Sequence, residues 1–144
     1  MSEPLSPEPS PNFTGIIRSV VVLVRDEDGR VLLASTSKNG PWSCIGGGVN
    51  DDEDLVSAAT RLAREDCGLS VEVGELLTEL SGDKFRVLYE CGADVTYQAV
   101  VLSASLFAEG EQAPMLTRWF APTELADLYL DEFARAALED LHLR

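Results

Sequence analysis

Two adjacent carboxylates, Glu65 and Asp66, follow an arginine at position 61 in a segment with the periodicity of an α-helix. Residues three and four apart on a helix share a face, so Arg61 and Glu65 are expected to project together, with Asp66 beside residue 62. Carboxylate oxygens are the ligands that Mg²⁺ prefers in proteins, so this segment is a candidate divalent-cation site. The alternative is a solvated helix face whose surface ion pair contributes under about 1 kcal/mol.

A glycine-rich segment precedes this helix. Residues 42–50 read WSCIGGGVN, and consecutive glycines let a backbone adopt conformations that are closed to other residues. Asp51 or Asp52 is expected to cap a helix that begins near Glu53, runs to about Cys67 and ends at Gly68 in a left-handed C-cap. An exposed carbonyl from the glycine segment and the two carboxylates would together be able to anchor one cation.

Residues 47–69, GGVNDDEDLVSAATRLAREDCGL, resemble the Nudix box, G-x5-E-x7-R-E-U-x-E-E-x-G-U, where U is aliphatic. Ala63 and Asp66 match it conservatively, and Leu62 stands where the box has the Glu after its Arg. The resemblance extends to the glycine approach and to RWFAPTEL at residues 118–125. The positions that match the box directly are Gly47, Glu53, Arg61, Glu65, Gly68 and Leu69.

The resemblance implies a metal-dependent hydrolase of nucleoside diphosphate derivatives, with Mg²⁺ or Mn²⁺ as the cofactor. It assigns the metal to the carboxylates of Glu65 and Asp66 and to the backbone carbonyl of Gly46. Arg61 would hold the acidic cluster in place through charge-assisted hydrogen bonds, and Glu53 would support that cluster. Water would attack a phosphorus while the metal neutralises charge on the phosphate oxygens.

Leu62 is the main departure from the box. In the family the missing Glu is a metal ligand and sometimes the base that activates water, and the loss of a positioned base typically costs roughly 10²- to 10⁴-fold in rate. Two functions therefore stay open: a hydrolase whose base lies on another loop, and a catalytically impaired module that binds a nucleotide or a protein. The acids that could supply another base are Asp83, Asp94, Glu109 and Glu111.

The apolar stripe of the expected helix is Val56, Ala59, Ala63 and Cys67, which would pack on the sheet. Leu62 is expected to lie off this stripe. The substitution Leu62→Glu should then fold with a melting temperature near that of the parent, and it should raise metal affinity and turnover.

Short aliphatic runs separated by Gly and Asp turns predict a β-hairpin over residues 18–34, followed by further strands and two helices. This order suggests an α/β (α+β) domain with a mixed sheet between helical layers, and the Nudix resemblance implies an α/β/α sandwich. The expected strands are residues 71–80, 85–91, 96–107 and 119–120, and the expected helices are residues 123–128 and 131–141.

Bulk properties limit the partners. The net charge of −14 disfavours nucleic acid, which requires many cations, and it would repel a free nucleotide unless a divalent cation bridges the nucleotide to the protein. No apolar run is long enough for a membrane span, and the start carries no signal-peptide pattern, so a cytoplasmic protein with reduced cysteines is expected. A Pro- and Ser-rich tail at residues 1–12 is expected to be disordered before a single domain at 13–144. The resemblance also leaves a homodimer open.

Overall fold

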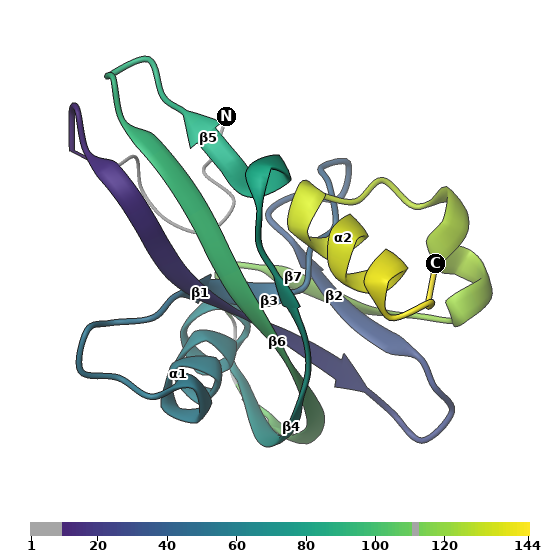
Figure 1. The fold of residues 1–144 in the computed structure, drawn as a ribbon. Coiled ribbons are helices and arrows are strands. Elements are labelled where there is room, and N and C mark those ends of the chain that lie inside the picture. The colour runs from purple at the N-terminus through teal and green to yellow at the C-terminus, as the bar shows by residue number, and fades with distance from the viewer. Residues whose placement is uncertain (1–9, 111–112) are drawn as a thin grey trace.

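A seven-stranded mixed sheet forms the centre of the protein in a computed structural model that describes residues 10–110 and 113–144. The strand order is β4-β6-β1-β2-β7, with β3 paired to β1 and β5 paired to β6 (Figure 1). Strands β1 and β6 are parallel, and the other neighbours are antiparallel. The elements are β1 Thr14–Arg25, β2 Val31–Ser35, β3 Ile45–Gly48, α1 Leu55–Cys67, β4 Leu69–Leu80, η1 Asp83–Phe85, β5 Arg86–Leu88, β6 Asp94–Glu109, β7 Leu116–Phe120, η2 Pro122–Asp127 and α2 Glu132–Asp140.

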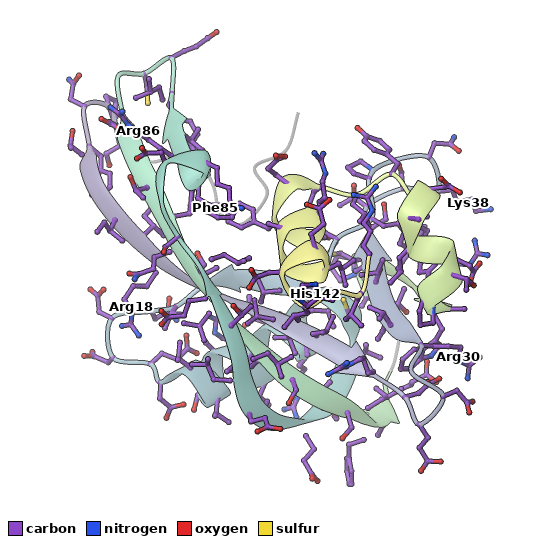
Figure 2. All side chains as sticks on the ribbon, turned by 45° about the vertical axis from the view of Figure 1, so that its right-hand side comes forward. Arg18, Arg30, Lys38, Phe85, Arg86 and His142 are labelled. Atoms are coloured by element: carbon purple, nitrogen blue, oxygen red, sulfur yellow. The ribbon has the colours of Figure 1, made fainter. Side chains whose placement is uncertain are left out.

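The middle of β1 is buried on both faces because helices cover both sides of the sheet. Side chains alternate across a strand, so Val20 and Val22 pack with α1 while Val21 and Leu23 pack with α2. Side chains fill both layers between sheet and helices (Figure 2). The expected α/β/α sandwich is confirmed.

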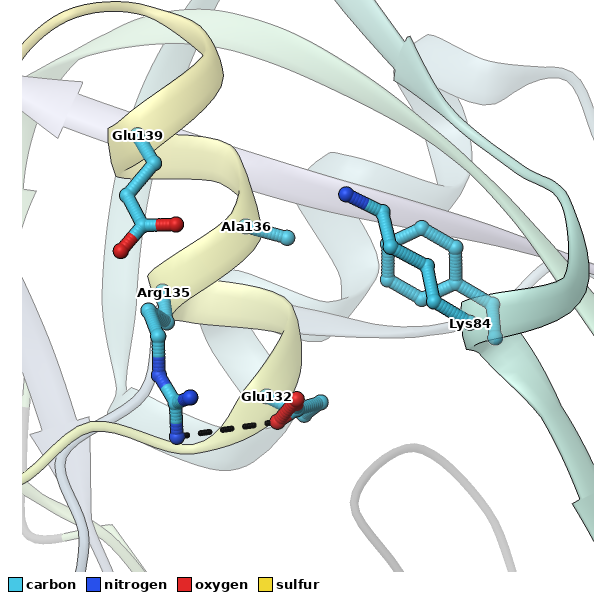
Figure 3. Close-up of a pocket in the computed structure, with 6 residues that line it drawn as sticks. Lys84, Glu132, Arg135, Ala136 and Glu139 are labelled. Atoms are coloured by element: carbon cyan, nitrogen blue, oxygen red, sulfur yellow. Dashed lines mark ion pairs between the residues drawn. The ribbon is translucent and has the colours of Figure 1, made fainter.

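The α2 layer is held by aromatic packing. Phe133 of α2 stacks on Phe85 at 5.2 Å between ring centroids and meets Tyr97 edge-on at 5.8 Å. Lys84 lies over the Phe85 ring at 5.3 Å, beside a pocket of about 150 Å³ (Figure 3). Two of the charged residues that line this pocket, Arg135 and Glu132, form an ion pair at 3.6 Å. None of the lining residues belongs to the glycine segment or to α1.

Most expected elements are present with altered bounds: β4, β6 and β7 are longer than expected, and α1, β5 and α2 are shorter. The hairpin is confirmed by the register Val24↔Leu32, but β1 continues beyond it to pair with β3 and β6. The helix expected at residues 123–128 is the 3₁₀ turn η2, Pro122–Asp127. Most of the expected tail, residues 1–9, lies outside the described part of the chain. Among the described residues, no helix has the length and apolar character needed to cross a membrane.

Candidate functional site

Helix α1 carries the acidic residues and is fixed at both ends. Asp54, rather than Asp51 or Asp52, is the N-cap, and its carboxylate accepts a hydrogen bond from the Ser57 N–H at 2.7 Å. At the other end Gly68 has φ 65°, the left-handed conformation expected of the C-cap. The helix therefore begins at Leu55, two residues later than expected.

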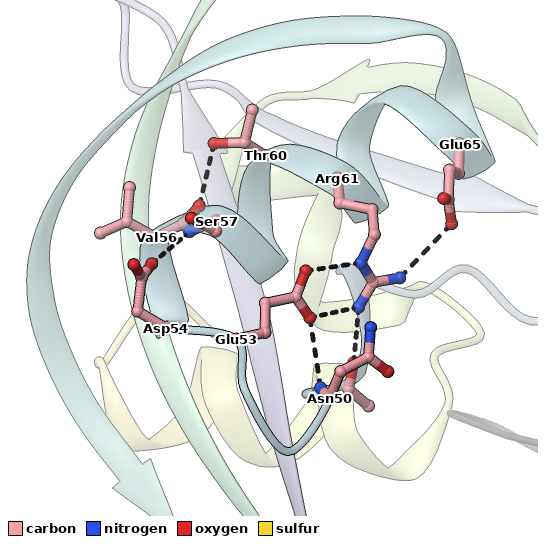
Figure 4. Close-up of polar contacts among 9 residues, drawn as sticks. Asn50, Glu53, Asp54, Val56, Ser57, Thr60, Arg61 and Glu65 are labelled. Atoms are coloured by element: carbon pink, nitrogen blue, oxygen red, sulfur yellow. Dashed lines mark hydrogen bonds and ion pairs between the residues drawn. The ribbon is translucent and has the colours of Figure 1, made fainter.

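Glu53 and Arg61 form a brace between the helix and the glycine strand (Figure 4). The Arg61 guanidinium donates to both Glu53 oxygens, from Nε and Nη2, at 2.8 Å each, and Nη2 also donates to the Gly48 carbonyl at 3.0 Å. Glu53 in turn accepts a hydrogen bond from the Asn50 N–H at 3.2 Å. These contacts join α1 to the end of β3, so the brace fixes the helix relative to the glycine segment.

The brace also sets the charge states of its members. The hydrogen bonds from Arg61 hold the pKa of the Glu53 carboxyl below its usual value, and the same contacts raise the pKa of Arg61. Both side chains are therefore ionised at neutral pH. The geometry is bidentate and the Glu53 side chain is only 15% exposed, unlike most surface ion pairs.

The acidic end of α1 is looser. The Glu65 side chain is 60% exposed, and its Oε1 lies 3.4 Å from the Arg61 Nη1. Asp66 is half-buried, and burial together with the neighbouring Glu65 charge raises the pKa of its carboxyl. Two acids are thus adjacent on the helix, and Arg61 contacts only Glu65 of the two, so a bound cation would relieve their repulsion.

Leu62 lies in the core, contrary to the expectation that it projects off the packed stripe. It is 7% exposed and belongs to the apolar cluster between α1 and the sheet, with Val20 and Ile45. Val56, which was expected in the stripe, is 53% exposed because the first turn of α1 is not covered. The buried residues of α1 are Ala58, Ala59, Leu62, Ala63 and Cys67.

The donors for a metal are therefore fewer than in a complete Nudix box. Gly46 lies in β3 opposite Val21, next to the strand end that the brace holds. Among the described residues, no group of three or more His, Cys, Asp or Glu side chains is arranged to hold a metal ion. Glu53 is already bonded to Arg61, which leaves the carboxylates of Glu65 and Asp66 and the Gly46 carbonyl as the expected donors to a hard cation.

The four candidate bases lie in different places. Asp94 is bonded to Arg86 through two 2.8 Å contacts, which lower the pKa of its carboxyl, at the far end of β6 from α1. Asp83 lies in η1, beside α2 rather than α1. Glu109 pairs with Leu69, three residues after Asp66, so it lies at the acidic end of α1. Glu111 lies outside the described residues.

The segments on either side of residues 111–112 are fastened to the same helix end, which sequence reasoning missed. The Gly110 N–H donates to the Gly68 carbonyl at 2.7 Å, and the Met115 N–H donates to the Asp66 carbonyl at 3.0 Å. These are backbone contacts, so no residue type could have indicated them. Burial raises the pKa of the Cys44 and Cys67 thiols to about 12, which favours their neutral form.

An α/β/α sandwich with a glycine strand braced to an acidic helix defines the Nudix class of domain. The family model described as NUDIX domain matches residues 15–141, and the chain therefore belongs to this family. The comparison with curated proteins gave no match.

Solved structures share the fold at low identity. A MutT protein from Methanosarcina mazei Go1 is 24% identical, with 90% of this chain and 94% of that chain covered and a TM-score of 0.68. A NUDIX hydrolase from Nitrosomonas europaea is 16% identical, with 89% of each chain covered and a TM-score of 0.67. An ADP-ribose pyrophosphatase from Streptococcus suis 89-1591 is 19% identical, with 88% of this chain and 87% of that chain covered and a TM-score of 0.62.

Proposed function

We propose that the protein hydrolyses the diphosphate linkage of a nucleoside diphosphate derivative or a nucleoside triphosphate. The observation that carries this proposal is the brace of Glu53, Arg61 and the Gly48 carbonyl. A helix that only packed on the sheet would not need a bidentate ion pair tied to the glycine strand. Family membership supports the same reaction class.

Each residue of the proposed site has a separate task. The carboxylates of Glu65 and Asp66 and the Gly46 carbonyl would hold Mg²⁺ or Mn²⁺, with water and phosphate oxygens as the remaining ligands. When bound, this ion would neutralise charge on the phosphate oxygens. Arg61 orients Glu65 and keeps α1 at a fixed distance from β3, and Glu53 holds Arg61 in that orientation.

The proton acceptor must lie elsewhere than residue 62, because leucine accepts no proton. Among the described acids beyond the box, Glu109 is the one that strand pairing brings to the acidic end of α1. We therefore assign Glu109 as the first base to test. Glu109→Gln should lower kcat by roughly 10²- to 10⁴-fold with little change in metal affinity. An unchanged kcat would exclude Glu109 as the base.

A substrate screen tests the proposed reaction. Nucleoside di- and triphosphate derivatives, including ADP-sugars because one neighbour is described as an ADP-ribose pyrophosphatase, are incubated with Mg²⁺ or Mn²⁺. Release of phosphate or nucleotide is expected, and the double variant Glu65→Gln/Asp66→Asn should abolish it. Release that persists in the double variant would contradict the proposed site.

The second candidate is a Nudix module that binds a nucleotide without hydrolysing it. The burial of Leu62 favours it, because an apolar side chain occupies the position of a metal ligand and base. Saturable nucleotide binding with no turnover under any metal in the screen would select this candidate. Turnover that depends on Glu65 would exclude it.

The proposed partners follow from charge. A net charge of −14 supports a small nucleotide bridged by a divalent cation and disfavours nucleic acid. We extend the proposal to a cytoplasmic location and to a homodimer. Sedimentation at several protein concentrations tests the dimer, and a single monomer mass throughout would reject it.

A further inference from the structure

A second pocket lies on the α1 side of the sheet, at the start of that helix. Its volume is about 250 Å³, and it is separate from the acidic end of the Nudix box. Arg18, labelled in Figure 2, is part of its lining, and the first residue of α1, Leu55, is another. The lining residues are Arg18 and Ser19 of β1, Leu55 of α1, Leu76 and Glu79 of β4, and Gln98 and Val100 of β6.

Strand pairing sets the arrangement of the polar groups in this pocket. Arg18 pairs with Gln98, and Val100 pairs with Glu79, so the three strands run in the order β1-β6-β4 across its floor. Neighbouring strands lie about 4.8 Å apart, which separates the strands of Arg18 and Glu79 by about 10 Å. A flat ring can lie between these two charges, over the side chain of Val100.

Within the described part of the chain, the side chains of Arg18, Glu79 and Gln98 have no protein partner. In residues 10–110 and 113–144, the side chains of Arg18, Glu79 and Gln98 make no hydrogen bond or ion pair with one another or with other described residues. The chain pairs other acids and arginines nearby, as at Arg86 and Asp94. One guanidinium, one carboxylate and one amide, all on solvent-exposed residues, therefore line this pocket with water in place of a protein partner, and a ligand can replace that water.

The combination selects a ligand by its hydrogen-bonding edges. The negative charge of Glu79 repels an anion such as free phosphate, and the positive charge of Arg18 repels a cation. Guanine presents two adjacent donors, N1–H and the 2-amino group, which suit a carboxylate, and two adjacent acceptors, O6 and N7, which suit a guanidinium. Adenine and uracil direct at least one acceptor toward the carboxylate at the corresponding edge. Leu55, Leu76 and Val100 supply apolar surface for the ring faces.

We propose that this pocket binds a guanine base, with Glu79 accepting from N1–H and the 2-amino group and Arg18 donating to O6 and N7. Gln98 contributes a further hydrogen bond. Leu55 and Glu65 are ten residues apart on α1, so the pocket lies about 15 Å along the helix from the acidic end. The proposal concerns binding alone and does not depend on hydrolysis or on a metal.

Calorimetric titration with GMP, IMP and AMP in EDTA tests the proposal. GMP should bind at one site per chain, and IMP, which lacks the 2-amino group, should bind roughly tenfold more weakly because one donor is lost. Glu79→Gln should weaken the binding of GMP by roughly ten- to hundredfold and remove most of the difference in affinity between GMP and IMP. Arg18→Met should weaken the binding of both GMP and IMP.

Matched controls keep the test specific. Glu75→Gln makes the same charge change at an exposed position of the same strand, outside the pocket lining, and should leave GMP affinity unchanged. Inorganic phosphate should not compete with GMP. Equal affinity for GMP and AMP, or GMP affinity that Glu79→Gln leaves unchanged, would overturn the proposal, as would the absence of GMP binding. None of these results bears on hydrolysis at Glu65 and Asp66, which the metal-dependent screen tests separately.

Discussion

Both ends of the Nudix helix carry carboxylates, but those near its start are hydrogen-bonded within the protein and those near its end are more exposed and weakly paired. Near its start, Glu53 receives two hydrogen bonds from Arg61 at 2.8 Å and is largely buried by its partners. Near its end, Glu65 is mostly exposed and Asp66 lies beside it with an elevated pKa. The first end stabilises its negative charge within the protein, and the proposed function assigns a divalent cation to the second. The helix therefore combines a fully hydrogen-bonded ion pair at one end with two weakly paired acids at the other.

Leu62 lies on the buried face of the helix, between the two ends. It fills the space between α1 and the sheet, where it packs with Val20 and Ile45. The apolar contact anchors the helix without any metal, but it removes a donor from the acidic end. The comparison teaches that the parts of a Nudix box that hold the helix in place can be retained while a part that performs chemistry becomes core.

The largest effect is expected from Leu62→Glu. This change removes a buried apolar side chain and introduces a carboxylate with no partner, so the free energy of unfolding without metal should fall by about 2–5 kcal/mol. Urea unfolding measures it. The earlier expectation of an unchanged melting temperature rested on an exposed Leu62 and is wrong on that point. A cost below about 0.5 kcal/mol would show that Leu62 is not packed.

Two comparisons sharpen this result. Val56→Glu makes a similar change at a 53% exposed position of the same helix and should alter stability by no more than about 0.5 kcal/mol. Mn²⁺ should restore part of the stability of Leu62→Glu, because the new carboxylate lies beside Glu65 and Asp66 and metal binding favours the folded state. The increase in turnover expected of Leu62→Glu stays a prediction for the folded, metal-bound protein.

The second prediction breaks the brace. Arg61→Lys replaces the planar fork by a single ammonium, which cannot bond both Glu53 oxygens and the Gly48 carbonyl together. Metal affinity, measured by calorimetry with Mn²⁺, should fall by roughly 10- to 100-fold, as is typical when a group that orients metal ligands is lost. Unchanged affinity would mean that the acidic end does not depend on the brace.

The third prediction concerns pH. The folded-state pKa of Glu53 lies below its ordinary value of 4.5, so its contribution to stability is present above about pH 4.5 and is lost as pH falls through the folded-state value. Glu53→Gln should thus be less stable than the parent at pH 7, and the difference should shrink as pH falls below 4.5. Urea unfolding across this range measures the difference, and a pH-independent difference would contradict the assigned role of the Glu53 charge.

The smallest effect is expected at the other end of the helix. Asp66→Asn removes one of two adjacent negative charges, so in metal-free buffer at pH 7 it should be slightly more stable than the parent, by less than the loss in Glu53→Gln. Urea unfolding of the parent and the variant in EDTA measures the difference in their free energies of unfolding. A clear loss of stability would show that Asp66 is satisfied without a cation.

The Nudix box could be predicted from the sequence because its glycines, acids and arginine have a fixed spacing. The structure confirms the helix α1, its C-cap at Gly68 and the α/β/α sandwich. The face of Leu62 was misjudged because four small or apolar residues fit a stripe equally well, and only the sheet decides which face is covered. The contacts of Gly110 and Met115 use backbone atoms alone and leave no pattern in the sequence. Pairing of Glu109 with Leu69 depends on strand register, which bulges in β4 shift.

Titration with Mn²⁺ tests the central claim most directly, namely that the acidic end of α1 is a metal site. Calorimetry on the parent should show one site per chain. The double variant Glu65→Gln/Asp66→Asn should lose that site while keeping the cooperative unfolding of the parent, because both residues lie outside the packed face. A Mn²⁺ affinity in the double variant equal to that of the parent would contradict the claim.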